Sequence, residues 1–130
     1  MNLALSYSKF NCFRVNVFRQ RGSVGIVVRK INFDIATLDD LGLSPILKDV
    51  MMTKRGLILV VGATGSGKST SLAAMVDHRN SNTSDHIITI GDQVEFVHRH
   101  KKSIVNQREV GTDTHSFQAA VKSVRLQASF

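Results

Sequence analysis

The stretch of sequence that decides the fold is a glycine-rich loop, Gly62-Ala63-Thr64-Gly65-Ser66-Gly67-Lys68-Ser69. It matches the pattern G-x-x-x-x-G-K-[ST] at every position. The continuous apolar run before it, residues 57–61, predicts a buried parallel strand. The apolar spacing after it predicts a helix over residues 69–78. A strand, this loop and a helix in that order indicate a phosphate-binding loop in an α/β fold.

The residue types of the loop suit the chemistry of a nucleoside triphosphate. Glycines allow a tight turn whose backbone N–H groups converge on a phosphate, and the helix N-terminus adds positive potential. Lys68 would bring a positive charge to the β- and γ-phosphates, and Ser69 would place its hydroxyl on Mg²⁺. A chance match is the alternative, and the flanking strand and helix argue against it. We expect ATP with Mg²⁺ to be bound by Gly62, Ala63, Thr64, Gly65, Ser66, Gly67, Lys68, Ser69 and Thr70.

The rest of the chain, which has 130 residues in all, supplies further elements. Alternation over residues 2–31, with a turn at 20–23, predicts a β-hairpin. A capped turn over 37–42 and a helix start at Ser44-Pro45 follow. The later pattern predicts a polar loop at 80–84, a buried strand at 86–90, extended pieces at 95–97 and 103–105, and a helix over 114–127 capped by Thr114. The strands at 57–61 and 86–90 would enclose the intervening helix in one βαβ unit.

The charge of the chain is strongly positive, with a formal net charge of +7. A basic chain raises nucleic acid as a partner. The segment before Asp34, the first acidic residue, reads as alternating strands rather than as a nucleic-acid motif, so we expect its basic residues to bind no nucleic acid. They are Lys9, Arg14, Arg19, Arg21, Arg29 and Lys30.

Neither a membrane span nor a signal peptide is expected. No apolar run approaches the roughly 20 residues that a spanning helix needs. Residues 1–13 carry Lys9 within their apolar stretch and lack a small-residue cleavage pattern. We therefore expect a cytoplasmic protein.

Several stretches beyond the loop resemble the type IV pilus retraction ATPases of the PilT/PilU type, within the secretion ATPases. The most specific stretch is Val105-Asn106-Gln107-Arg108-Glu109. Ala63 and the run Thr114-His115-Ser116 are closer to the accessory than to the principal retraction ATPase. The other matching stretches are residues 13–18, 54–57, 62–75, 86–98 and 103–110.

The resemblance implies an α/β fold, namely part of a RecA-like P-loop core preceded by the last β-hairpin of an N-terminal domain. The expected organisation is a remnant of that domain over 1–33, a helical connector over 34–54 and the N-terminal half of the core over 55–130. The resemblance further implies a hexameric ring of identical or related subunits, whose ATP hydrolysis powers pilus retraction and twitching motility. The ring would lie in the cytoplasm, peripheral to the inner membrane at the pilus base, with the inner-membrane platform as its partner.

The resemblance also assigns roles to single residues. Glu95 lies in the segment similar to the family's acidic box, where it would polarise the attacking water, and Lys68 would share in catalysis. Arg14 and Arg29 lie where the family has inter-subunit arginines that contact nucleotide held by a neighbouring subunit. The alternatives are a surface charge for Glu95 and solvated residues on a hairpin face for the two arginines.

Two departures from the family pattern limit these expectations. Gly91-Asp92-Gln93 stands where the acidic box begins Glu-Asp-Pro, and the chain stops before the family's Walker B strand. We therefore expect a fragment that does not hydrolyse ATP alone. The alternative is a truncated nucleotide-binding or ring-associating module without turnover. The run His98-Arg99-His100 lacks a third ligand, so no metal site is expected there.

Overall fold

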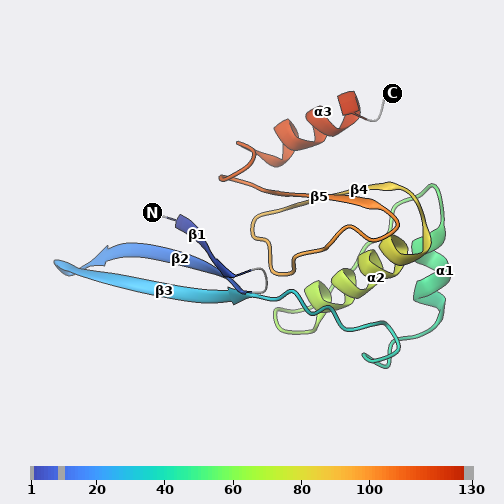
Figure 1. Cartoon of the computed structure of the whole chain (residues 1–130), viewed down its shortest axis with the longest axis horizontal. Helices are drawn as coiled ribbons and strands as arrows, with labels where there is room; N and C mark the ends of the chain where they lie inside the picture. The colour runs from blue at the N-terminus through green and yellow to red at the C-terminus, as the bar shows by residue number, and fades with distance from the viewer. Residues whose placement is uncertain (1, 9–10, 128–130) are drawn as a thin grey trace. The chain divides into compact units, whose positions relative to one another are not determined.

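The computed structural model of the chain describes residues 2–8 and 11–127, so the outer limits of the predicted domains 1–33 and 55–130 lie outside the described residues. The fold divides into two units. The first unit comprises Met1–Asp34 with Glu95–Val97, and the second comprises Ile35–Val94 with His98–Phe130. Each unit has its own sheet, and Figure 1 labels the elements of both.

The sheet of the first unit is antiparallel and has three strands in the order β1-β2-β3. These strands are β1 (Asn2–Ser8), β2 (Asn11–Gln20) and β3 (Ser23–Ile31). The predicted hairpin is confirmed for β2 and β3, and β1 adds a third strand. Arg21 and Gly22 join them with φ values of 48° and 80°. Two residues with positive φ give the turn twist that matches a right-handed hairpin.

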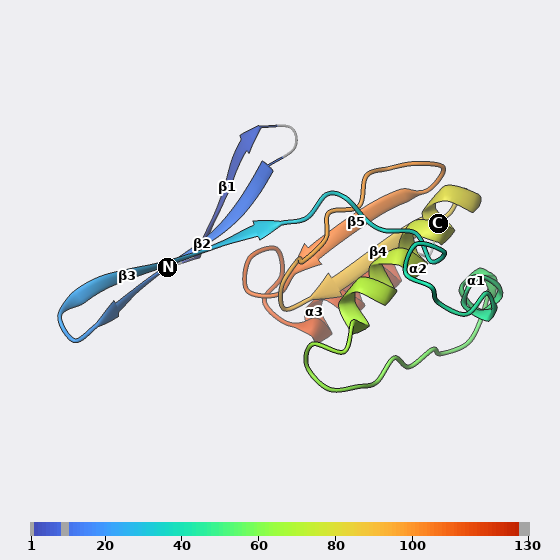
Figure 2. The same cartoon turned by 90° about the horizontal axis from the view of Figure 1, so that it is seen from below.

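The sheet of the second unit pairs β4 (His86–Gly91) with β5 (Ile104–Glu109) in parallel. The views in Figures 1 and 2 place α2 (Lys68–Asn82) on one face of this sheet and α3 (Phe117–Gln127) on the other. Apolar side chains are buried on both strands and on α3, namely those of Ile87, Val105 and Ala120. The α/β fold class and the strand predicted over 86–90 are confirmed.

A second apolar cluster joins α2 to α1 (Ile46–Met52). Its buried members are Leu38, Ala74 and Met75, with Leu41, Leu43, Leu47 and Met51 packed against them. The sequence predicts a helix start at Ser44-Pro45, and α1 begins directly afterwards. The apolar side chains of α1 therefore pack the connector, residues 34–54, against α2.

The predicted turn over 37–42 is present and is closed by two residues. The Thr37 hydroxyl accepts a hydrogen bond from the backbone N–H of Asp40 at 3.1 Å, and the Asp40 carboxylate accepts one from the N–H of Thr37 at 3.0 Å. The Thr37 hydroxyl also donates to the Asp40 carboxylate at 2.6 Å, and this bond, together with the one from the Thr37 N–H, holds the pKa of Asp40 below its usual range. Gly42 ends the turn with φ 62°, a value that favours glycine.

The strand predicted over 57–61 is wrong. This run is coil, and its side chains except that of Val60 are exposed: Leu57 is 83% exposed, Leu59 75% and Val61 85%. A strand forms when its N–H and C=O groups pair with a neighbour. Within the described part of the chain, β4 pairs with β5 and no strand pairs with this run. The predicted βαβ unit is therefore absent, and α2 follows a coil.

The predicted ends of two helices are also wrong. α2 continues past residue 78 to Asn82, into the first part of the predicted polar loop at 80–84, and the Asn80 side chain is buried and bonded. Its Nδ2 donates to the carbonyl of Arg99 at 2.7 Å, and its Oδ1 accepts from the N–H of Lys101 at 3.2 Å. α3 begins three residues after Thr114, since the hydroxyl of Ser116 accepts from the N–H of Ala119 at 3.1 Å.

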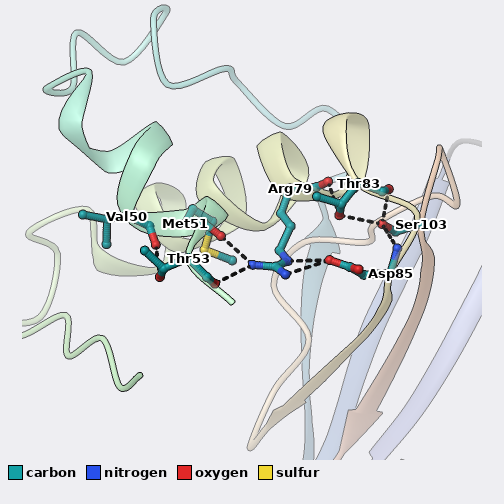
Figure 3. Close-up of polar contacts among 7 residues, drawn as sticks. All are labelled: Val50, Met51, Thr53, Arg79, Thr83, Asp85 and Ser103. Atoms are coloured by element: carbon teal, nitrogen blue, oxygen red, sulfur yellow. Dashed lines mark hydrogen bonds and ion pairs between the residues drawn. The ribbon is translucent and has the colours of Figure 1, made fainter. Parts of the chain in front are cut away.

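One guanidinium group joins α1, α2 and the start of β4, as Figure 3 shows. Arg79 donates through Nε and Nη2 to Oδ2 of Asp85 at 3.0 and 2.7 Å. Its Nη1 donates to the carbonyl oxygens of Met51 at 2.7 Å and Thr53 at 3.1 Å. The bond from Arg79 is the main reason that the pKa of Asp85 lies below its ordinary value. We refer to these contacts as the Arg79 clamp.

Across residues 2–8 and 11–127, none of the helices combines the length and apolar character required to cross a membrane.

Candidate functional site

The glycine-rich loop is an exposed turn that leads directly into α2. Gly65 and Gly67 have φ values of 79° and 86°, which a residue with a side chain rarely adopts. The N–H of Ser66 donates to the carbonyl of Ala63 at 3.2 Å and closes the turn. The glycines predicted to allow a tight loop are therefore placed where the backbone requires them.

The third glycine of the loop, Gly62, lies close to the side chain of Ser66. A Cβ atom added to Gly62 would lie 2.7 Å from the hydroxyl oxygen of Ser66. The loop therefore closes on itself and leaves an inner surface of backbone groups. Such a surface suits an anion that is held by N–H donors.

The N-terminus of α2 adds further donors to this surface. Gly67 is the N-cap residue, and no side chain caps it in the described structure. The first intrahelical bond runs from the N–H of Ser71 to the carbonyl of Gly67 at 2.8 Å. The N–H groups of the preceding residues have no partner within a helix, and together with the helix dipole they attract anions.

Lys68 is the one cation within the loop sequence, and its side chain folds back over the loop. Its Nζ donates to the carbonyl of Ala63 at 2.6 Å. The ammonium group therefore lies at the loop itself. The adjacent Ser69, in the first turn of α2, is exposed. Backbone donors, an ammonium group and a hydroxyl form the donor set that a magnesium-bound triphosphate needs.

Glu95 does not belong to the same unit as the loop. It lies in the short segment Glu95–Val97 of the first unit, next to the end of β3. The N–H of Asn32 donates to the carbonyl of Glu95 at 3.3 Å, and the N–H of Val97 donates to the carbonyl of Asn32 at 3.0 Å. The side chain of Glu95 is exposed. Its role with the attacking water stays a prediction.

The structure brings Arg14 and Arg29 together. They are directly opposite partners in the β2–β3 ladder. Opposite residues in an antiparallel pair point to the same face of the sheet. Two guanidinium groups at this spacing can contact one polyanionic ligand, which suits the predicted contact with nucleotide.

The two imidazoles of the run His98-Arg99-His100 have different surroundings. His98 is only 9% exposed, whereas the Nδ1 of His100 accepts a hydrogen bond from the N–H of Val105 at 3.0 Å. The described residues contain no group of three or more His, Cys, Asp or Glu side chains that could hold a metal ion.

Burial makes His98 sensitive to pH. Desolvation lowers its pKa, which the charge of Asp77 raises and that of Lys101 lowers. As the pH falls below about 6.5, the unfolded chain takes up this proton before the folded chain does, so the free energy of unfolding decreases. We expect a smaller decrease in His98→Gln, measured by urea denaturation at about pH 7.5 and 5.5. The same decrease in both proteins would show that His98 is not responsible.

Sequence reasoning missed two side chains that organise the segment around Glu95. The Oε1 of Gln107 accepts a hydrogen bond from the N–H of His98 at 2.7 Å. The Oε2 of Glu109 accepts one from the N–H of Val94 at 3.1 Å. Both belong to the stretch that carried the resemblance, but nothing in its spacing indicates bonds to the backbone of another segment.

Comparison with known proteins identifies the family. The family model described as type II/IV secretion system protein matches residues 1–126. The chain belongs to this family. Within it, the chain is 53% identical over 127 residues to the type IV pilus ATPase PilU of Pseudomonas aeruginosa, covering 98% of this chain and 33% of that protein. It is 50% identical over 111 residues to PilT of the same organism, named a type IV pilus retraction ATPase, covering 85% of this chain and 32% of that protein.

A solved structure of this family has the same fold. It is the pilus retraction motor PilT with bound ADP, which matches with a TM-score of 0.89 and 48% sequence identity. The match covers 95% of this chain and 36% of that one. The chain therefore spans about a third of the length of the relatives that it matches. The predicted family resemblance is confirmed.

Proposed function

We propose that the chain is the ATP-binding portion of a motor ATPase that powers type IV pilus retraction and hence twitching motility. The observation that carries the proposal is the loop at the N-terminus of α2, with two left-handed glycines and the Lys68 ammonium held against it. The names of the relatives, pilus ATPases and a retraction motor with bound ADP, support the choice of ATP and of pilus retraction.

In this proposal the loop binds the triphosphate through its backbone N–H groups. The N–H groups of residues 62–70 surround the β-phosphate, and Lys68 neutralises charge between the β- and γ-phosphates. Mg²⁺, when bound, spreads the negative charge of the phosphates, and Ser69 is its ligand from the loop. Glu95 accepts a hydrogen bond from the attacking water in the assembled motor.

The proposed assembly is a hexameric ring of identical or related subunits. Arg14 and Arg29, opposite each other on β2 and β3, contact nucleotide held by the neighbouring subunit. The ring lies in the cytoplasm, peripheral to the inner membrane, and acts on the inner-membrane platform of the pilus. No nucleic acid takes part.

The second candidate is a nucleotide-binding or ring-associating module without turnover of its own. The observation that favours it is the exposed, unpaired run at 57–61, which leads into the loop. A phosphate-binding loop that follows a coil has less support than one that follows a buried strand. We propose that the isolated chain binds ATP but does not hydrolyse it.

Mixing experiments test the proposed ring. We expect the purified chain to turn over Mg·ATP no faster than Lys68→Ala, and to co-elute with the full-length P. aeruginosa PilU on size exclusion. With Mg·ATP in the buffer, Arg14→Ala/Arg29→Ala should reduce co-elution, because it removes the proposed contacts with nucleotide held by the neighbouring subunit. The control Arg19→Ala/Arg21→Ala removes two other cations of the same hairpin and should co-elute normally. A chain that elutes alone at every ratio, or equal losses in both double variants, would contradict the ring proposal.

A further inference from the structure

The last strand of the second unit carries two acceptor side chains on one face. Gln107 and Glu109 are two residues apart on β5, and alternate residues of a strand point to the same side. Both side chains are half-buried. Their oxygens accept from backbone N–H groups of one other segment, Gln107 from His98 at 2.7 Å and Glu109 from Val94 at 3.1 Å.

The two donors have a particular place along the chain. The segment Glu95–Val97 belongs to the first unit. Val94, directly before it, and His98, directly after it, belong to the second unit. The bonds to Glu109 and Gln107 therefore hold the backbone at both ends of that segment. No other residues adjoin it in the sequence.

Glu109 is itself held in place. Its Oε1 accepts from the hydroxyl of Thr112 at 3.2 Å, and its N–H donates to the carboxylate of Asp113 at 2.8 Å. The ladder also continues past it, because the N–H of Val110 donates to the carbonyl of Gly91 at 2.9 Å. A carboxylate that is fixed at both its oxygens makes a well-directed acceptor for a backbone N–H.

We propose that Gln107 and Glu109 are positioning residues that fix the two ends of the segment bearing Glu95. They act through the backbone at Val94 and His98. The importance of this placement for catalysis rests on the proposed function, in which Glu95 polarises water. The anchoring itself is a property of the chain and is measured without nucleotide.

Amide hydrogen exchange of the isotopically labelled chain, followed by NMR, tests the anchors one at a time. In Glu109→Ala we expect exchange at the amide of Val94 to accelerate about tenfold or more, because it loses a charged acceptor, with a smaller change at His98. In Gln107→Ala the amide of His98 should accelerate and that of Val94 should not. The amide resonance of Glu95 should move in Glu109→Ala.

Two further variants separate anchoring from general destabilisation. Glu109→Gln keeps an oxygen that can accept, so the protection of Val94 should return. Asn106→Ala alters the neighbour on the opposite face of β5, whose amide contacts His86 at 2.8 Å, and should leave both amides protected. Uniform acceleration that includes the core amides of Ile87 and Val105, or no acceleration at either anchor, would overturn the proposal.

Calorimetry with Mg·ATP on the same proteins distinguishes failure of the proposed function from failure of the anchoring proposal. We expect both alanine variants to bind Mg·ATP within about twofold of the unaltered chain, because the loop has its own support. If the unaltered chain binds no Mg·ATP, the proposed function fails while the exchange pattern still decides on the anchors. A loss of affinity in Glu109→Ala equal to that in Lys68→Ala would overturn the assignment of Glu109 as a positioning residue.

Discussion

Replacing Lys68 with alanine is expected to weaken Mg·ATP binding by at least about a hundredfold, because charge-assisted bonds to phosphate are lost from a site built on backbone donors. The loop itself should persist. Its shape depends on Gly65 and Gly67 and on the bond from Ser66 to Ala63, none of which involves the Lys68 side chain; the substitution removes the bond between Nζ and Ala63. Isothermal titration calorimetry of the folded variant measures the effect.

Lys122→Ala is the matched control, since it removes an exposed lysine on α3 of the same unit. It should bind Mg·ATP as the unaltered chain does. Equal losses of affinity in the two variants would show that binding follows the net charge of +7 and not the loop.

Removing the Arg79 clamp is expected to have the largest effect on stability. We expect Arg79→Ala to lower the free energy of unfolding by about 2 kcal/mol, because the carbonyl oxygens of Met51 and Thr53 lose a charged donor that also joins α1 to α2. Figure 3 shows these contacts converging on one guanidinium group. Urea denaturation followed by circular dichroism measures the change.

Two further variants make this result specific. Arg79→Lys keeps the charge without the planar fork and should recover only part of the stability. Lys48→Ala breaks the ion pair with Asp39, whose side chain is 72% exposed, and should cost under about 1 kcal/mol. Losses of the same size in Lys48→Ala and Arg79→Ala would contradict the clamp.

Two of the correctly predicted elements have local causes, whereas the confirmed strand at 86–90 pairs with the distant β5. The turn over 37–42 follows from a cap and a glycine, and the β2–β3 hairpin follows from alternation around Arg21-Gly22. The run at 57–61 has the composition of a buried strand, yet it is exposed coil. A strand depends on a partner elsewhere in the chain, and its own composition does not say whether that partner is there.

Within the candidate site, too, some residues could be predicted from the sequence and others could not. The loop residues were predicted from one contiguous pattern, and the structure places them together at the start of α2. The contacts of Asn80 with Arg99 and of Glu109 with Val94 span 19 and 15 residues. Hydrogen bonds from a side chain to a distant backbone group leave no periodic signal in a sequence. The roles of these residues could therefore be identified only from the structure.

The central claim is that residues 62–70 bind the phosphates of a nucleoside triphosphate. Titrating the ¹⁵N-labelled chain with Mg·ATP and following every backbone amide tests it most directly. We predict that the largest saturating shifts fall on the amides of Gly62 through Thr70 and vanish in Lys68→Ala. Shifts confined to the basic turn at 99–102 or to the β2–β3 hairpin, with the loop amides unmoved, would contradict the claim.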